Sequence, residues 1–275
     1  MSEAETNRGS ATNGLGRLLN SPGKIAGVFF AVVGILVVGM RINPEKYDSP
    51  RFGSAHLPVE IVAALVVAFV LLTVPDRGQL GWRRGEGRTR SWLVLPLLAV
   101  GLAVLSAALT YASLPRSAAI DAVLVGRTVT TSLLVGFVEE VLFRGLLLVA
   151  LVRALGIGGG VLVSSLCFGV VHGINVLGGA PVGQTLIQVT FTCILGTLFL
   201  LAAMGTRSLL LPILLHAVWD SAAFLNIYLQ TLGASANAVS VLASALGVLG
   251  VVQTFRVVRR WTGGDIYPVQ GLPQR

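Results

Sequence analysis

The sequence predicts an all-α fold, a polytopic transmembrane bundle of about eight helices. Only 12% of its 275 residues are charged, whereas soluble domains carry about 25%. The mean hydropathy is +0.83. Apolar runs long enough to cross a bilayer, which need roughly 17 to 25 residues, recur along the chain. The loops between these runs are too short to fold by themselves, so we expect one compact membrane domain.

Each expected helix corresponds to one apolar run. The first run is short, but no small-residue cleavage site follows it, so we expect a retained helix and not a signal peptide. The sixth and seventh runs are separated only by the sequence MGTRS, which predicts a tight hairpin. The expected spans are 25–40, 59–75, 92–113, 128–152, 157–174, 185–205, 207–230 and 237–258.

Polar segments flank this bundle. Residues 1–23 are rich in Gly, Ser and Asn and predict a disordered cytoplasmic N-terminus. Residues 24–260 form the expected transmembrane domain, and residues 261–275 form a Gly/Pro-rich, flexible C-terminal tail. Fourteen Lys and Arg residues fall on the side of the membrane that holds both termini, against five on the opposite side. This asymmetry predicts a multi-pass protein of the cell membrane with both termini in the cytoplasm.

The net charge of +8 does not indicate a nucleic-acid partner. The arginines lie in short loops beside apolar runs, where they act as orientation signals. The partner that composition predicts is therefore the lipid bilayer. Cys167 and Cys193 both lie within apolar runs, and we interpret them as small buried hydrophobic residues.

The fourth expected helix contains three ionisable residues in the stretch GFVEEVLFRGLLL. A carboxylate near the bilayer centre costs about 3 kcal/mol on insertion scales unless it is paired or faces a wet cavity. Arg144 follows Glu140 by four residues, so these two side chains share one helical face and can neutralise each other. Glu139 is rotated by about 100° from Glu140 and has Phe143, not a cation, four residues later. One acid is thus balanced locally, and the other must be balanced by a group elsewhere in the bundle.

Two of the three histidines also lie inside expected helices. His172 lies in the fifth helix, and His216 lies in the seventh, where Asp220 follows it by four residues on the same face. We interpret His56, in the first outer loop, as a solvated loop residue. We expect no strongly polar side chain deep in the bundle beyond one intramembrane ionisable set, which is Glu139, Glu140, Arg144, His172, His216 and Asp220.

Several functions are compatible with this set. Each pair could be a structural tie between helices, but two acid–base pairs with a further Glu and His favour function. A proton-coupled carrier would also use such residues, yet carriers often carry repeats, and here all the residues fall in the second half of the chain. The set could hold zinc. It equally suits metal-free hydrolysis, in which a glutamate activates water and histidines orient it and stabilise an oxyanion.

Three motifs in this part of the chain resemble those of one protein family. The stretches are EEVLFR at 139–144, FGVVH at 168–172 and HAVWD at 216–220. They are similar to the Glu-Glu-x-x-x-Arg, Phe-x-x-x-His and His-x-x-x-Asn/Asp motifs of the CPBP family, the CAAX-protease and bacteriocin-processing intramembrane peptidases. The motifs occur in the family's order within a core at 128–230. Each alone is weakly specific, whereas the three together on membrane helices are strongly so.

The resemblance implies an eight-helix bundle and a glutamate-dependent intramembrane endopeptidase with no catalytic metal or other cofactor. It implies that Glu139 is the general base that activates water, with help from His172. It also implies that Glu140 and Arg144 orient the site. The expected partner is a membrane-embedded or membrane-associated peptide or protein substrate.

The resemblance assigns the oxyanion side of the site to His216 and Asp220. Here the chain departs from the prenyl-protease members, which have Asn where this chain has Asp220. Asn donates a hydrogen bond to an oxyanion but ionised Asp cannot, so Asp220 is either protonated or orients His216. This departure favours a bacterial-type member with a peptide or membrane-protein substrate over one that processes prenylated proteins. A family-like scaffold or immunity factor without protease activity is the alternative.

Overall fold

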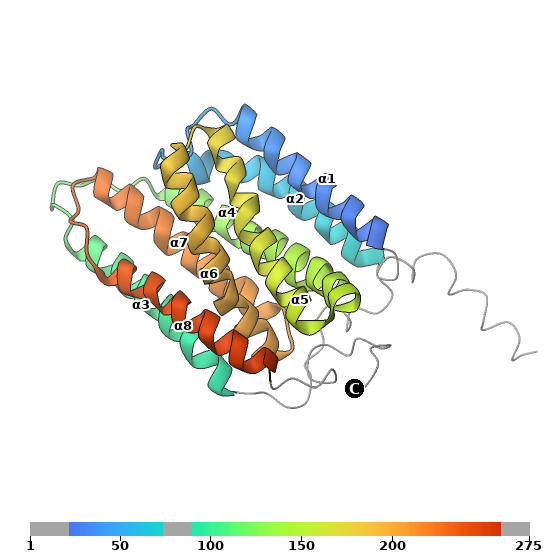
Figure 1. The fold of residues 1–275 in the computed structure, drawn as a ribbon. Coiled ribbons are helices and arrows are strands. Elements are labelled where there is room, and N and C mark those ends of the chain that lie inside the picture. The colour runs from blue at the N-terminus through green and yellow to red at the C-terminus, as the bar shows by residue number, and fades with distance from the viewer. Residues whose placement is uncertain (1–21, 74–89, 260–275) are drawn as a thin grey trace, which may run out of the picture.

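The computed structural model describes residues 22–73 and 90–259, and within these ranges the chain is a bundle of helices without strands (Figure 1). The predicted C-terminal tail and nearly all of the predicted disordered N-terminus lie outside the described residues. In chain order, the elements are α1 (Pro22–Ile42), α2 (Phe52–Thr73), η2 (Arg90–Leu93), α3 (Val94–Ala112), α4 (Ala122–Glu140), η3 (Val141–Leu147), α5 (Leu148–Val171), η4 (His172–Gly178), α6 (Val182–Thr206), α7 (Leu210–Thr231) and α8 (Val239–Arg259).

The predicted all-α membrane bundle is confirmed. In the described ranges, seven helices are long and apolar enough to cross a membrane, and one of them runs for 57 residues, from Ala122 to Gly178. A straight helix of that length would measure about 86 Å, while the bilayer core is about 30 Å thick. The chain turns back at Gly156, whose φ of 72° and ψ of 176° favour glycine (Figure 1). The predicted fourth and fifth helices are the two legs of this hairpin.

The tight hairpin predicted between the sixth and seventh helices is present. α6 ends at Thr206 and α7 begins at Leu210. Between them, Arg207 adopts the left-handed conformation, with φ 50° and ψ 41°. The side chain of Ser208 accepts a hydrogen bond from the backbone N–H of Leu210 at 3.2 Å, which stabilises the start of α7.

The predicted start of the second helix, at residue 59, is wrong. The structure begins α2 at Phe52 and places Pro58 inside the helix. His56 is therefore a helical residue with 3% exposure and not a solvated loop residue. Glu60 lies two turns into the helix with 4% exposure. This position contradicts the expectation that no further strongly polar side chain lies deep in the bundle.

α4 packs against both α2 and α7 (Figure 1). Gly136 permits a close approach of α7, because a Cβ at this position would lie 2.8 Å from the carbonyl oxygen of Ile213 and 3.1 Å from the backbone nitrogen of Ala217. The contact brings Glu140 and His216 together across 76 residues of sequence. Residues of the first and third motifs therefore meet at one point.

The outer surface of the bundle is apolar. Among the large apolar side chains that point outward, Phe30, Phe69 and Leu72 are each more than two thirds exposed. Monomeric soluble proteins rarely expose contiguous apolar surface on this scale. The exposed side chains therefore agree with the apolar helices in indicating a multi-pass membrane protein.

Candidate active site

Glu140 is the centre of a buried polar network at the end of α4. Its side chain is fully buried, and its Oε1 accepts hydrogen bonds from Nη1 of Arg144 at 2.7 Å and from Nδ1 of His216 at 2.9 Å. Because an ionised carboxylate can only accept, Nδ1 of His216 carries a proton in this contact. The Glu140–Arg144 pair that the four-residue spacing predicts is present, and it extends to α7 through His216.

Arg144 connects this network to α6. Its Nη2 donates a hydrogen bond to the carbonyl oxygen of Gly196 at 2.9 Å. Its guanidinium carbon lies 3.9 Å from the centroid of the Phe168 ring, a cation–π geometry. The lack of a side chain at Gly196 makes this approach possible, because a Cβ there would lie 2.9 Å from Nη2 of Arg144 and 2.7 Å from the Phe168 ring.

The first motif spans a change in helix type. α4 ends at Glu140, and the next seven residues, Val141–Leu147, form a π-helix. The carbonyl of Phe143 accepts one hydrogen bond from the N–H of Leu148, five residues later, and another from Oγ of Ser164 at 3.2 Å. Short π-helical segments often occur at functional sites. A hydrophobic period of 3.6 residues does not predict this segment.

Glu139 makes no hydrogen bond to the Glu140 network and lines a cavity of about 620 Å³. The side chain of Glu139 is 13% exposed, and its Oε2 lies 3.9 Å from Nε2 of His216, which is too far for a hydrogen bond. That oxygen has no hydrogen-bond partner in the described part of the chain. The spacing predicts that Glu140 pairs with Arg144 and that Glu139 does not, and the position of Glu139 at the cavity is a finding of the structure.

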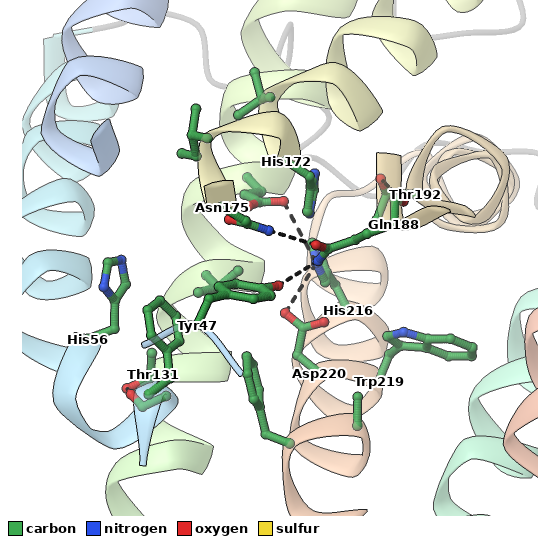
Figure 2. Close-up of a pocket in the computed structure, with 18 of the residues that line it drawn as sticks. Tyr47, His56, Thr131, His172, Asn175, Gln188, Thr192, His216, Trp219 and Asp220 are labelled. Carbon is green, nitrogen blue, oxygen red and sulfur yellow. Dashed lines mark hydrogen bonds and ion pairs between the residues drawn. The ribbon is translucent and has the colours of Figure 1, made fainter. Parts of the chain in front are cut away.

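His216 presents its second ring nitrogen to the same cavity. The ring stacks on Phe199, with centroids 4.7 Å apart and an interplanar angle of 15°. Its Nε2 lies 3.5 Å from Oδ2 of Asp220, one turn further along α7 (Figure 2). Glu139, Glu140 and Asp220 therefore place three carboxyl groups around one imidazole.

His172 lines the cavity from the first residue of η4 (Figure 2). Its Nδ1 lies 2.8 Å from the carbonyl oxygen of Phe168. Because a carbonyl can only accept, Nδ1 carries the proton, and Nε2 of the neutral ring is an acceptor. No hydrogen bond or ion pair joins His172 to Glu139 or Glu140 among the described residues. The three motifs thus share one cavity without all being in direct contact.

A chain of neutral polar residues borders the cavity near η4 (Figure 2). Gln188 donates a hydrogen bond from Nε2 to the hydroxyl of Tyr47, and Nδ2 of Asn175 donates to Oε1 of Gln188 at 2.9 Å. Burial raises the pKa of Tyr47 to about 12, outweighing the lowering effect of its bond to Gln188. Tyr47 is therefore a neutral phenol at physiological pH. Sequence reasoning missed these residues, because their contacts join distant segments.

α2 adds a second acid–base pair that sequence reasoning also missed. His56 and Glu60 both line the cavity, and Nε2 of His56 lies 3.5 Å from Oε1 of Glu60. A signal was present, because the two residues have the same four-residue spacing as His216 and Asp220. This spacing indicates a shared helical face only if both residues are helical, and the expected helix begins after His56.

Metal binding has no evident centre here. In the stretches that the structure describes, no group of three or more His, Cys, Asp or Glu side chains is arranged to hold a metal ion. The carboxyl and imidazole groups of the cavity instead come from α2, α4, η4 and α7, and several of them form acid–base pairs. Such groups can accept or donate protons.

These features define a class of protein, a multi-pass helical membrane protein with acid–base side chains around an internal cavity. Residues 121–222 match the model of a family described as Rce1-like, type II CAAX prenyl endopeptidase. The matched segment contains all six residues of the intramembrane ionisable set. The resemblance to the CPBP and CAAX protease family is therefore confirmed for this segment, which covers less than half of the chain. The match supports protease activity, which is a hydrolase activity. No curated protein and no solved structure matches the chain.

Proposed function

We propose that the chain is an intramembrane endopeptidase that hydrolyses a peptide bond in a membrane-embedded or membrane-associated peptide or protein. One observation carries this proposal. Glu139 lines the cavity, and its Oε2 has no hydrogen-bond partner in the described part of the chain. Glu140 is not part of the cavity lining, and its Oε1 is held by Arg144 and His216. A buried acid facing a cavity is suited to take a proton from a water molecule.

In this mechanism, a water molecule between Glu139 and His172 is the nucleophile. Glu139 takes one proton from the water while the water oxygen bonds to the scissile carbonyl carbon. His172 orients the water through Nε2, the acceptor nitrogen that its bond to Phe168 leaves available. The C–N bond then breaks, and Glu139 passes the proton to the leaving amine. The carboxylate of Glu139 is thereby regenerated.

His216 is suited to stabilise the oxyanion that forms during attack. Its Nδ1–H is fixed by Glu140, and this contact aims Nε2 into the cavity. A proton on Nε2 would give the oxyanion a charge-assisted hydrogen bond. Arg144 and Glu140 act as positioning residues because they hold the ring and are themselves buried. We propose that Asp220 positions His216 from the cavity side.

Asp220→Asn is expected to keep kcat/KM for peptide cleavage within about tenfold of the wild type. The contact of Asp220 with His216, at 3.5 Å, is longer than that of Glu140, at 2.9 Å, and Asn preserves its size. Cleavage kinetics of the purified variant check this. An inactive but folded variant would show that the charge of Asp220 is essential.

Proteolysis itself is tested by comparing new peptide N-termini in membranes from cells that make the wild type or Glu139→Gln at matched levels. The expected result is a set of termini found only with the wild type, which would also identify substrates. Indistinguishable samples over several growth conditions would instead favour a scaffold or a proton-coupled carrier.

We also propose that both termini are cytoplasmic and that the cavity opens at the opposite end of the bundle. The cavity lining includes Tyr47 and Asp48, from the loop between α1 and α2, and Gln184, near the start of α6. Asp48 and Gln184 are exposed. The backbone N–H of Tyr47 donates to the carbonyl of Gly178, which places this loop beside η4. The sequence pattern predicts the excess of Lys and Arg on the other, cytoplasmic side, so the substrate would enter the site from the non-cytoplasmic side.

Cysteine labelling checks this orientation. In a chain whose Cys167 and Cys193 are replaced by Ala, Asp48→Cys is expected to react with a membrane-impermeant maleimide in intact cells. The matched control, Ser208→Cys in the α6–α7 turn, should react only after the membrane is permeabilised. The reverse pattern would place the cavity opening in the cytoplasm.

A further inference from the structure

The cavity contains a second polar pair that the proposed hydrolysis does not use, His56 and Glu60 on α2. Both side chains are more than nine-tenths buried, with 3% and 4% exposure. Nε2 of His56 and Oε2 of Glu60 have no hydrogen-bond partner within the described ranges. Leaving such atoms unpaired in the interior costs free energy. A bound molecule that supplies hydrogen bonds to these two atoms would explain why the interior contains them.

Glu60 lies at about the same depth in the bundle as Glu139. Oγ1 of Thr131 on α4 donates a hydrogen bond to the carbonyl of Gly53 on α2 at 2.8 Å. Thr131 and Gly53 therefore lie at the same depth along the bundle axis. The starts of both helices also border one surface cavity, so the helices run in the same direction. Seven residues further along, about 10 Å deeper, α2 reaches Glu60 and α4 reaches Val138. Val138 is next to Glu139, so Glu60 and Glu139 lie at similar depths.

The hydrogen bonds of His56 determine which of its nitrogens carries the proton. Oδ1 of Asn43 accepts a hydrogen bond from the backbone N–H of Glu45 at 3.0 Å, so the Asn43 amide nitrogen faces His56. That nitrogen donates to Nδ1 of His56 at 3.1 Å. Nδ1 is therefore an acceptor, and Nε2 carries the proton of the neutral ring. The pair thus offers one N–H donor and one carboxyl acceptor side by side.

A donor beside an acceptor is complementary to the free C=O and N–H groups on the main chain of an unwound peptide. A membrane-spanning helix satisfies its own backbone hydrogen bonds, and a segment unwound for cleavage loses them. Each freed N–H and C=O then needs a partner in apolar surroundings, or it costs several kcal/mol. Nε2–H of His56 can donate to a substrate carbonyl, and Oε2 of Glu60 can accept from a substrate N–H.

We propose that His56 and Glu60 form a binding subsite for a main-chain amide of the unwound substrate, level with Glu139 in the same cavity. This subsite rests on the proposed endopeptidase function but is separate from its chemical step. It holds the unwound segment while Glu139 and His172 act on the scissile bond. Its loss is expected to weaken substrate binding and to leave the chemistry intact.

Two shape-conserving substitutions test the subsite. Glu60→Met removes the acceptor, and His56→Phe removes the donor but keeps the ring that stacks on Phe52 at 5.0 Å. Each is made in the Glu139→Gln chain, so that binding is measured without cleavage. The probe is a dye-labelled leucine peptide of about 20 residues with a central Gly-Pro-Gly break. Its Kd for the purified protein in lipid nanodiscs is measured by anisotropy, beside the thermal unfolding midpoint.

Each substitution is expected to raise the Kd of the probe about tenfold and to leave the unfolding midpoint unchanged or higher. The matched control, Ile61→Met on the outward side of α2, should leave both unchanged. An unchanged Kd overturns the subsite, as does a failure of the Glu139→Gln chain to bind the probe. A lowered midpoint with unchanged Kd would identify a structural tie. If the subsite is supported but the wild type cleaves nothing, only the endopeptidase function fails.

Discussion

Glu139→Gln is expected to lower kcat/KM for peptide cleavage by at least about 100-fold while the protein remains folded. General bases contribute rate factors of about 100 to 10,000, and the Gln amide cannot take a proton from water. The change removes a charge that has no hydrogen-bond partner at Oε2 among the described residues, so little stability should be lost. The measurement is cleavage of an identified substrate by purified wild type and variant in the same lipid.

The matched comparison for this experiment is Glu139→Asp, which keeps the carboxylate but withdraws it by one methylene. Partial activity in Glu139→Asp with none in Glu139→Gln would support a role in proton transfer. Equal activity of Glu139→Gln and the wild type would remove this mechanism. The search for the base would then turn to His172 and Asp220, which line the same cavity.

Glu140→Ala is expected to destabilise the protein by about 3 kcal/mol or more. The change removes the carboxylate partner of Arg144, a residue with 2% exposure, and it removes the acceptor for Nδ1 of His216. The free energy of unfolding in mixed detergent micelles, together with the yield of membrane-inserted protein, measures this loss.

A paired substitution separates the loss of a charge partner from the loss of volume at Glu140. Replacing both Glu140 and Arg144 by Met removes the whole ion pair and fills much of the space. Such exchanges of buried pairs are often neutral or stabilising. We expect the double variant to unfold less readily than Glu140→Ala. Stability of Glu140→Ala equal to the wild type would mean that water already reaches the pair.

The features predicted correctly from sequence are those that depend on short spacing along one helix. The apolar runs predict the bundle, because length and hydropathy decide whether a helix can span a bilayer. The four-residue spacing of Glu140 and Arg144 predicts their pairing, because such residues share a helical face. Glu139 falls outside that pair for the same reason, and the structure places it against the cavity.

The features that sequence reasoning missed depend on helix boundaries or on long-range contacts. Proline is common at a helix start, so a helix that begins after Pro58 fits the sequence pattern, and this pattern does not reveal that His56 is helical and buried. The bond between Arg144 and the carbonyl of Gly196 joins residues 52 positions apart. The π-helix at Val141–Leu147 also escapes prediction, since its side chains fit an apolar helix of either type.

Phe168 makes two contacts that have a joint consequence. Its ring lies against the guanidinium of Arg144, and its backbone carbonyl holds Nδ1 of His172. One residue of α5 therefore contacts both His172, the proposed water-orienting residue, and Arg144, which holds Glu140. A shift of α5 relative to α6 would displace both together. The positions of His172 and Arg144 should thus be lost cooperatively, in one step, when the packing of α5 against α6 is disrupted.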